Sequence, residues 1–235
     1  MRLDKLCAEL NIGSRSDVKK IIRSGQIQVN GNVVKSPDTH VDENTAVILY
    51  QGKEFYYSKL LYFMLNKPAG VVSATEDSHD KTVIDLLKEQ YPDLKLSDTF
   101  PVGRLDKDTV GLLLLTNDGE LAHRLLSPRS HVDKTYFVRL DSTLSDEGVE
   151  KIESGLDIGE DKLTLPAKLK IVSTNEYFIT IHEGKFHQIK RMFHAVGCEV
   201  IYLKRISMGS LSLDESLPEG KIRPLTPEEV KILRK

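Results

Sequence analysis

The stretch GRLDKDTVGLLLLTND, residues 103–118, indicates how the chain folds. Its centre, residues 110–115, is a continuous apolar run that ends at the polar turn of residues 117–119. A run of this length, closed by turn residues, is typical of a strand buried on both faces. Asp106 is therefore predicted to lie on the loop that enters a core strand.

The chemistry of this loop has two interpretations. Asp106, Asp108 and the following Thr109 match the phosphatase pattern Asp-x-Asp-x-Thr, but those aspartates belong at the carboxyl end of a strand. Here the strand follows the aspartates, and no later cluster completes a magnesium site, so we set this interpretation aside. Arg104 and Lys107 flank Asp106, and their charges favour its ionised form beside an anionic substrate. Such a carboxylate suits a nucleophile or an electrostatic partner at a sugar carbon.

Length and composition set the broad class. The 235 residues suffice for one large domain or two smaller ones, and 40% hydrophobic with 29% charged residues is ordinary for a globular protein. The sequence has neither a signal-peptide core nor an apolar run of the roughly 18 residues that a membrane helix needs. Two distant cysteines, Cys7 and Cys198, predict a reducing, cytoplasmic compartment. A net charge of −2 gives no overall sign of a polyanionic partner, so only local clusters of basic residues can indicate one.

The beginning of the chain has the pattern of a small domain. Helices are predicted over residues 3–10 and 15–24, the second opened by a Ser-x-x-Asp capping box. The turn Asn30-Gly31 predicts a hairpin. We therefore expect a domain of two helices and a small curled sheet over residues 1–50, followed by a linker over residues 51–60.

A basic stripe follows one face of the second predicted helix. Its members are Arg15, Lys19, Lys20 and Arg23. Most such stripes are solvated helix faces, and the functional alternative is a surface that follows RNA phosphates. Residues 2–34, RLDKLCAELNIGSRSDVKKIIRSGQIQVNGNVV, resemble the S4 domain, a small RNA-binding module. This resemblance favours the RNA-binding interpretation.

From residue 61 onward, strands and helices alternate irregularly, which favours an α+β fold over a doubly wound sheet. The predicted strands are 61–74, 110–115, 134–140, 162–172, 177–184 and 199–209. The predicted helices are 82–91, 119–127, 145–156, 186–197 and one opened by Thr226.

Three separated motifs carry a second resemblance. GRLDKDTVGLLLLTNDGEL, KTYFVRL and EGKFHQIKRMFHAVG together resemble pseudouridine synthases of the bacterial RsuA branch. The resemblance implies an αL-like S4 domain followed by a catalytic domain with a mixed, largely antiparallel sheet over residues 61–235. It also implies isomerisation of one uridine in 16S ribosomal RNA, in which the glycosidic bond breaks and uracil re-bonds through C5. That reaction needs no cofactor and no metal.

The resemblance assigns roles to particular residues. Asp106 is implied to be the catalytic aspartate, either attacking C1′ or deprotonating C2′, and Tyr136 to lie near the target base. Lys190 is implied to pair with Asp106, with Arg191 as the alternative. Further contacts with the RNA or the base are expected from Arg104, Arg191, His187, Gln188 and Leu203, besides the basic stripe. Arg104 would occupy the space that a flipped uridine leaves.

Three alternatives stay open at this point. His187, His194 and Cys198 are spaced so that a metal site is conceivable, although no second ligand pair supports it. A non-enzymatic RNA-binding or ribosome-assembly protein would keep the S4 domain without the chemistry. The same chemistry on 23S RNA is a third possibility, but HQIK in the last motif is closer to the small-subunit enzyme. We expect a monomer that acts on a partly assembled small subunit, with no membrane partner.

Overall fold

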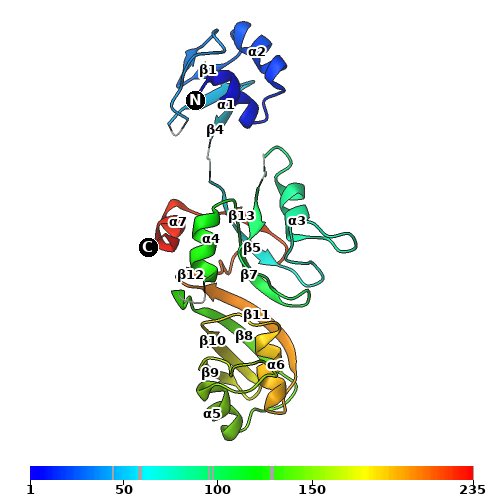
Figure 1. Cartoon of the computed structure of the whole chain (residues 1–235). Helices are drawn as coiled ribbons and strands as arrows, with labels where there is room; N and C mark the ends of the chain where they lie inside the picture. The colour runs from blue at the N-terminus through cyan, green and yellow to red at the C-terminus, as the bar shows by residue number, and fades with distance from the viewer. Residues whose placement is uncertain (44, 58–59, 95, 97, 128–129, 235) are drawn as a thin grey trace. The chain divides into compact units, whose positions relative to one another are not determined.

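A computed structural model describes the chain except residues 44, 58–59, 95, 97, 128–129 and 235 (Figure 1). The chain divides into two compact units. The first comprises Met1–Leu61 and Lys88–Asp98, and the second comprises Tyr62–Leu87 and Thr99–Lys235. Among the described residues, no helix is long and apolar enough to cross a membrane.

The first unit contains two helices and a sheet with the strand order β2-β1-β3-β4. Its elements are α1 (Leu3–Glu9), α2 (Arg15–Arg23), β1 (Gln28–Val29), β2 (Asn32–Val33), β3 (Val47–Tyr50) and β4 (Lys53–Tyr56). The Ser14 hydroxyl caps α2 by accepting a hydrogen bond from the Asp17 N–H, as the sequence pattern predicts. Asn30 and Gly31, with φ of 50° and 80°, form the predicted hairpin turn. The core is Leu3, Leu6, Cys7, Val18, Ile22, Ile27, Ala46 and Ile48.

Two segments differ from the expected domain boundaries. The expected linker is partly wrong, because Lys53–Tyr56 is strand β4 and pairs antiparallel with β3. Residues 88–98, expected in the second domain, cluster with the first unit, where the Asn11 side chain donates a hydrogen bond to the Asp93 carbonyl at 3.0 Å. Neither pairing is encoded in local sequence pattern.

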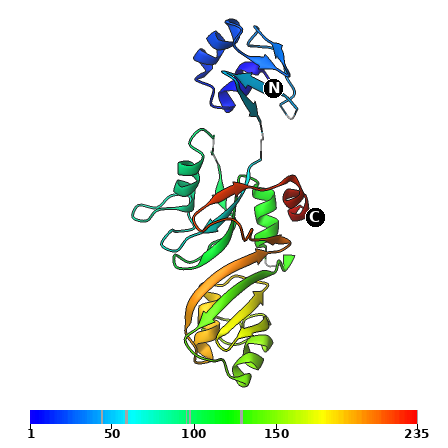
Figure 2. The same cartoon turned by 180° about the vertical axis from the view of Figure 1, so that it is seen from behind.

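The second unit is built on one long mixed sheet with the order β13-β5-β7-β11-β8-β10-β9 (Figure 2). Its strands are β5 (Tyr62–Lys67), β6 (Phe100–Pro101), β7 (Val110–Thr116), β8 (Lys134–Leu140), β9 (Lys168–Ser173), β10 (Glu176–Ile181), β11 (Val200–Met208), β12 (Leu211–Ser212) and β13 (Ile222–Pro224). All named pairs in it are antiparallel except β7 with β11. The predicted α+β class with a largely antiparallel sheet is confirmed. The strand expected over 162–172 begins only at Lys168.

Strand β7 is an interior strand of this sheet, and every one of its residues is buried, as predicted. It pairs antiparallel with β5 on one side and parallel with β11 on the other. Gly111 permits the second pairing, because a Cβ placed on it would lie 2.3 Å from the Arg205 carbonyl oxygen. Its φ of 98° also favours glycine.

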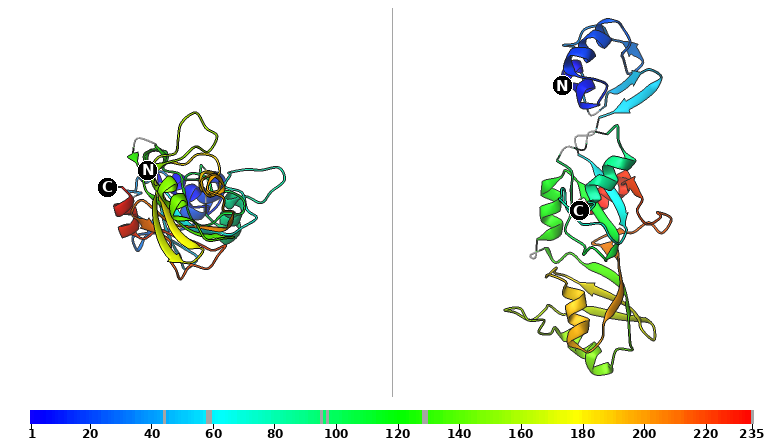
Figure 3. Two further views of the ribbon diagram at one scale, coloured as in Figure 1. Left: turned by 90° about the horizontal axis from the view of Figure 1, so that it is seen from below. Right: turned by 90° about the vertical axis from the view of Figure 1, so that its right-hand side faces the viewer.

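The helices α4 (Gly119–Leu126), α5 (Asp146–Ser154), α6 (Gln188–Ala195) and α7 (Pro227–Leu233) belong to the second unit (Figure 3). Helix α3 (Val83–Gln90) begins in this unit, and its residues from Lys88 onward cluster with the first unit. α6 packs on β11 and α5 on β9. The predicted cap at Thr226 is confirmed as a capping box with Glu229.

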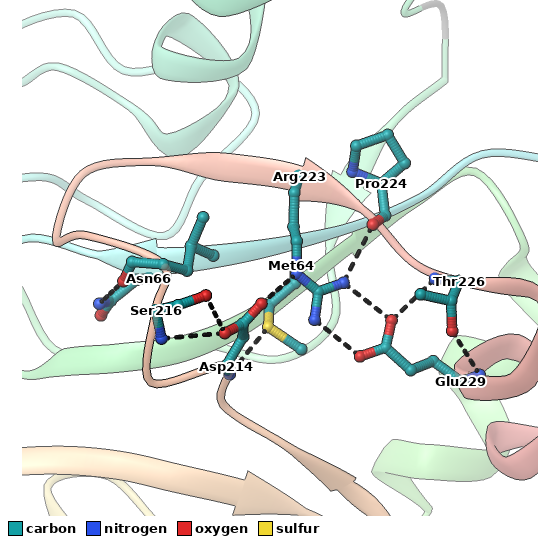
Figure 4. A network of polar contacts seen from close by, with 9 residues as sticks. Met64, Asn66, Asp214, Ser216, Arg223, Pro224, Thr226 and Glu229 are labelled. Atoms are coloured by element: carbon teal, nitrogen blue, oxygen red, sulfur yellow. Dashed lines mark hydrogen bonds and ion pairs between the residues drawn. The ribbon is translucent and has the colours of Figure 1, made fainter.

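A polar network fastens the C-terminal segment (Figure 4). The Arg223 guanidinium on β13 donates to Asp214 Oδ2 at 2.8 Å and to both carboxylate oxygens of Glu229 at 2.8 Å. The backbone N–H of Asp214 lies against the sulfur of Met64 on β5. The network therefore joins β13, the start of α7 and the loop before β13 beside strand β5.

Candidate active site

The loop that precedes β7 is fixed from below by a buried lysine. Lys67, at the end of β5, is fully buried, and its ammonium group donates hydrogen bonds to main-chain carbonyl oxygens only. The acceptors are Pro68 at 3.0 Å, Asp106 at 3.1 Å, Lys107 at 3.3 Å and Thr109 at 2.9 Å. One side chain thus sets the path of the backbone on both sides of the Asp106 carboxylate.

Ser73 holds the same loop from the other side. Its hydroxyl donates to the Leu105 carbonyl at 2.9 Å and accepts from the Leu105 N–H at 3.0 Å. The N–H of Gly70 donates to the Lys107 carbonyl at 2.8 Å. Because Leu105 and Lys107 are both anchored, the residue between them has little freedom to move.

Lys67→Met is expected to lower the free energy of unfolding by about 2–4 kcal/mol, because it leaves buried carbonyl groups without donors. Thermal melting of the full chain measures this loss. Lys168→Met, which removes an exposed lysine from β9, is the matched control and should melt close to the wild type. A Lys67→Met protein as stable as the control would contradict the anchoring role.

The same variant has a pH signature. Burial lowers the pKa of Lys67 to about 8, although the Asp108 and Asp106 carboxylates oppose the shift. Below pH 8 the amine is charged in both the folded and the unfolded protein, so folding carries the full cost of burying the charge. Between pH 8 and about 10.5 the amine is neutral in the folded protein but still charged in the unfolded protein, so this cost falls as the pH rises. We expect the stability difference between wild type and Lys67→Met to widen over that range. A constant difference would argue against titration of Lys67.

The Asp106 carboxylate lies between two cationic or potentially cationic side chains. Its Oδ2 is 3.4 Å from Lys190 Nζ and its Oδ1 is 3.5 Å from His187 Nε2. Lys190 Nζ also contacts Asp108 Oδ1 at 2.5 Å. Partial burial acts to raise the pKa of Asp108, but the hydrogen bond and charge of Lys190 outweigh it and lower the pKa.

The flanking cations of the sequence are not the partners of Asp106. Lys107 forms an ion pair with Asp80 at 2.7 Å instead. Arg104 is exposed at the rim of the site, and none of its described neighbours forms a hydrogen bond or ion pair with it. Both residues line the larger hollow together with Asp106, so their effect on the carboxylate stays a prediction, and the observed ion-pair partners of Asp106 come from elsewhere in the chain. Arg104 is available to a ligand.

Helix α6 supplies the actual partners from its first turns. His187, its N-cap, has a φ of 49°, in the left-handed region, and reaches Asp106. Lys190 points into the site, whereas Arg191, the alternative, pairs with Glu160 at 2.7 Å and also donates to the Ile158 and Phe186 carbonyls. Successive helix positions differ by about 100° in direction, so only one of the two can face Asp106.

Gln188, an expected RNA contact, lines the smaller hollow but makes its hydrogen bonds within the protein. It is only 4% exposed, its Oε1 accepts from the Lys185 N–H at 2.9 Å, and its Nε2 donates to Glu183 Oε1 at 2.8 Å. Gln188 therefore shapes the loop between β10 and α6, and that loop presents His187 to Asp106.

Two hollows share Asp106. The smaller, of about 80 Å³, is lined by Leu203 and Lys190, and the larger, of about 670 Å³, by Lys134 and Arg205. Tyr136, 7% exposed on β8, lines both. The structure thus brings the expected residues Arg104, Asp106, Tyr136, His187, Lys190 and Leu203 to one site.

An exposed aromatic pair forms part of the rim. Phe186, 70% exposed, stacks on His187 with ring centroids 3.8 Å apart and an interplanar angle of 19°. Exposed rings of this kind can stack nucleic-acid bases.

The three residues considered for a metal site each contact a different partner. His187 faces Asp106, His194 contacts Glu199 at 2.5 Å, and Cys198 is buried against the Ser142 hydroxyl. Over the described part of the chain, no group of three or more histidine, cysteine or acidic residues is placed to hold a metal.

The basic stripe of the first unit lies on α2, opposite the buried Val18 and Ile22. Arg15, Lys20 and Arg23 are exposed, and Lys19 is half-buried. Two of its members have acidic neighbours at long range, Lys19 with Asp4 at 3.9 Å and Lys20 with Asp17 at 3.8 Å. The stripe thus keeps most of its charge accessible.

Sequence reasoning missed four polar residues that build the site, namely Lys67, Ser73, Lys134 and Arg205. Each is at least nine-tenths buried. A lysine or arginine inside an apolar strand pattern was the available signal, since such residues are almost never fully buried without a partner.

A carboxylate with cationic neighbours in a cleft of one unit, in a chain whose other unit carries a basic helix face, is the arrangement of an RNA-modifying enzyme. Sequence profiles agree with this class: the RNA pseudouridylate synthase family matches residues 61–195, and the S4 domain matches residues 1–47. The chain belongs to the RNA pseudouridylate synthase family.

Similar proteins match along the whole chain. An uncharacterised RNA pseudouridine synthase of Bacillus subtilis is 48% identical over 99% of this chain and 98% of its own length. The ribosomal small subunit pseudouridine synthase A of Vibrio cholerae is 41% identical over 98% of both. A crystal structure of a pseudouridylate synthase superimposes with a TM-score of 0.68 at 37% identity and covers 99% of each chain.

Proposed function

We propose that this pseudouridine synthase isomerises one uridine of small-subunit (16S) ribosomal RNA, of the same type as pseudouridine 516. It acts in the cytoplasm as a monomer on a partly assembled small subunit. The observation that carries the proposal is the Asp106 carboxylate, which lies between His187 and Lys190 at a hollow lined by Tyr136 and Leu203.

Asp106 acts on the ribose of the target nucleotide. Whether it attacks C1′ or takes the proton from C2′, the step requires its negative charge, and the bond from C1′ to uracil N1 breaks. Lys190 orients the carboxylate through the 3.4 Å contact. The detached base then turns and re-bonds to C1′ through C5, so no atom is gained or lost and no cofactor is consumed.

Tyr136 and Leu203 hold the base during this turn. Leu203 packs against one side of the uracil, and Tyr136 takes part in removing the C5 proton. Both are almost fully buried on neighbouring strands, β11 and β8, which pair with each other. Side chains on paired strands keep their spacing while the base rotates.

Arg104 contacts the RNA from the rim. A uridine within folded RNA must leave its stack before C1′ is reached, at a cost of a few kcal/mol. An arginine without a hydrogen-bond or ion-pair partner in the described part of the chain can occupy the vacated space and contact phosphate.

The choice of RNA is supported by the relatives that are named ribosomal small subunit pseudouridine synthase A. Incubation with unmodified 16S RNA, 23S RNA and tRNA, followed by carbodiimide mapping, tests it. We expect one modified position in 16S RNA and none in the others. Equal modification of 23S RNA would contradict the substrate, and binding without modification would contradict the enzymatic role.

Reversing the basic stripe is expected to weaken substrate binding. Arg15→Glu with Lys19→Glu should raise KM for 16S RNA by about tenfold and flatten the dependence of affinity on salt, because phosphate contacts are lost. Steady-state kinetics at two salt concentrations measure both effects. Lys35→Glu, an exposed lysine in the same unit, is the control and should change KM little. A similar rise of KM in both variants would mean that the overall charge of the unit, and not the stripe, determines RNA binding.

A further inference from the structure

Two cationic side chains lie next to each other inside the larger hollow. Arg205 on β11 is 2% exposed and Lys134 on β8 is 9% exposed. Arg205 pairs in register with Tyr136, two residues after Lys134 on the same face of the strand. Both therefore face the same space as the target base.

One of these two cations, Arg205, has a side-chain nitrogen without a hydrogen-bond acceptor among the described residues. Arg205 Nε donates to the Leu112 carbonyl at 2.7 Å, but Arg205 Nη2 has no partner among the described residues. Lys134 Nζ donates to the Val132 carbonyl at 3.1 Å. The guanidinium edge is thus buried in the wall of the hollow with donor capacity to spare.

No described carboxylate forms an ion pair with either cation. The nearest acidic residue along the chain, Asp133, contacts His182 Nδ1 at 2.6 Å. Burial, and after it the charge of Arg205, lowers the pKa of Lys134. The charge of Asp133 opposes this lowering only in part. Two buried like charges that lack an ion-pair partner are costly for a fold, so a bound anion would reduce a cost that the free protein carries.

The position of Arg205 and Lys134 beside the base-binding hollow indicates which kind of anion they would bind. The smaller hollow, with Leu203, suits the uracil ring, and the larger one adjoins it, because Asp106 and Tyr136 line both. The anion nearest to a nucleoside in RNA is its own phosphodiester, and a guanidinium fork matches two phosphate oxygens. We propose that Arg205 and Lys134 form a phosphate subsite that binds a phosphodiester adjoining the target uridine. This inference rests on the proposed function.

Thermal melting of the full chain tests the subsite without RNA chemistry. Inorganic phosphate, uridine 5′-monophosphate, uridine 3′-monophosphate and uridine are compared at equal ionic strength. We expect phosphate and one of the two monophosphates to raise the melting temperature by roughly 2–5 °C and uridine to have no such effect. The effective monophosphate identifies which side of the nucleotide is bound.

Arg205→Gln should abolish this shift and weaken RNA affinity by roughly 10- to 100-fold, whereas Lys168→Gln, an exposed control on β9, should do neither. In the absence of anions, Arg205→Gln should melt within a few degrees of the wild type, because the loss of the hydrogen bond to the Leu112 carbonyl is offset by the removal of a buried charge that has no ion-pair partner among the described residues. A lower melting temperature with an unchanged phosphate response would show a structural role and overturn the proposal. If Arg205→Gln does not fold, Lys134→Gln takes its place with the same expectations.

Failure of the subsite and failure of the proposed function give different results. A wild-type protein that modifies 16S RNA but shows equal melting shifts with and without Arg205 overturns only the subsite. A wild-type protein that modifies no RNA overturns the function, while its phosphate response is read independently.

Discussion

Asp106→Asn is expected to lower the rate of isomerisation by about 10⁴-fold or more while RNA affinity stays within a few-fold. The amide keeps the size and position of the side chain but removes the negative charge that the sugar chemistry requires. The contacts with Lys190 and His187 also lose their electrostatic part. Single-turnover kinetics on 16S RNA and a filter-binding titration measure the two quantities.

Asp108→Asn is the matched control for this experiment. Asp108 is two residues away and contacts the same Lys190 amine, at 2.5 Å, but its side chain is 72% exposed. The control should lose at most a few-fold in rate. Turnover by Asp106→Asn, or equal inactivity of the two variants, would remove Asp106 from its catalytic role.

Gly111→Val is expected to prevent the second unit from folding, with most of the protein insoluble. The new Cβ would meet the Arg205 carbonyl oxygen at 2.3 Å and its nitrogen at 2.9 Å, both main-chain atoms that cannot move aside. A φ of 98° adds strain for a β-branched residue. Soluble yield and circular dichroism measure the effect.

Gly119→Ala provides the comparison, because a Cβ at Gly119, at the start of α4, meets nothing within 4 Å. It should be as stable as the wild type or slightly more stable. A soluble Gly111→Val protein with a wild-type melting curve would mean that β7 and β11 separate without cost.

Local patterns predicted much of this fold. The apolar run of β7 and the caps at Ser14 and Thr226 are each specified by a few neighbouring residues, and the structure has them where they were expected. The two domains and the family followed from motifs that are continuous in sequence. The catalytic candidates Asp106, Tyr136 and Lys190 belong to those motifs, and the structure brings them together.

What failed depends on distant contacts. β4 was expected to be a linker because its pairing with β3 is not visible in its polar composition. Lys67 gave only the signal of a lysine at a strand end, and its acceptors other than Pro68 lie about 40 residues later. The charged chain neighbours of Asp106 were the local signal, whereas its observed ion-pair partners His187 and Lys190 come from a helix more than 80 residues away.

The position of strand β5 links the order of synthesis to the closure of the sheet. Its neighbours in the sheet are β7, from the middle of the chain, and β13, close to the C-terminus. Until β13 is made, β5, an apolar strand with buried residues on both faces, has no partner on one side and is an open edge of the sheet. The loop that Lys67 holds is complete much earlier, because its acceptors end at Thr109. A nascent chain with β13 still inside the ribosomal exit tunnel therefore exposes the β5 edge to wrong pairing, and the C-terminal segment is what closes it.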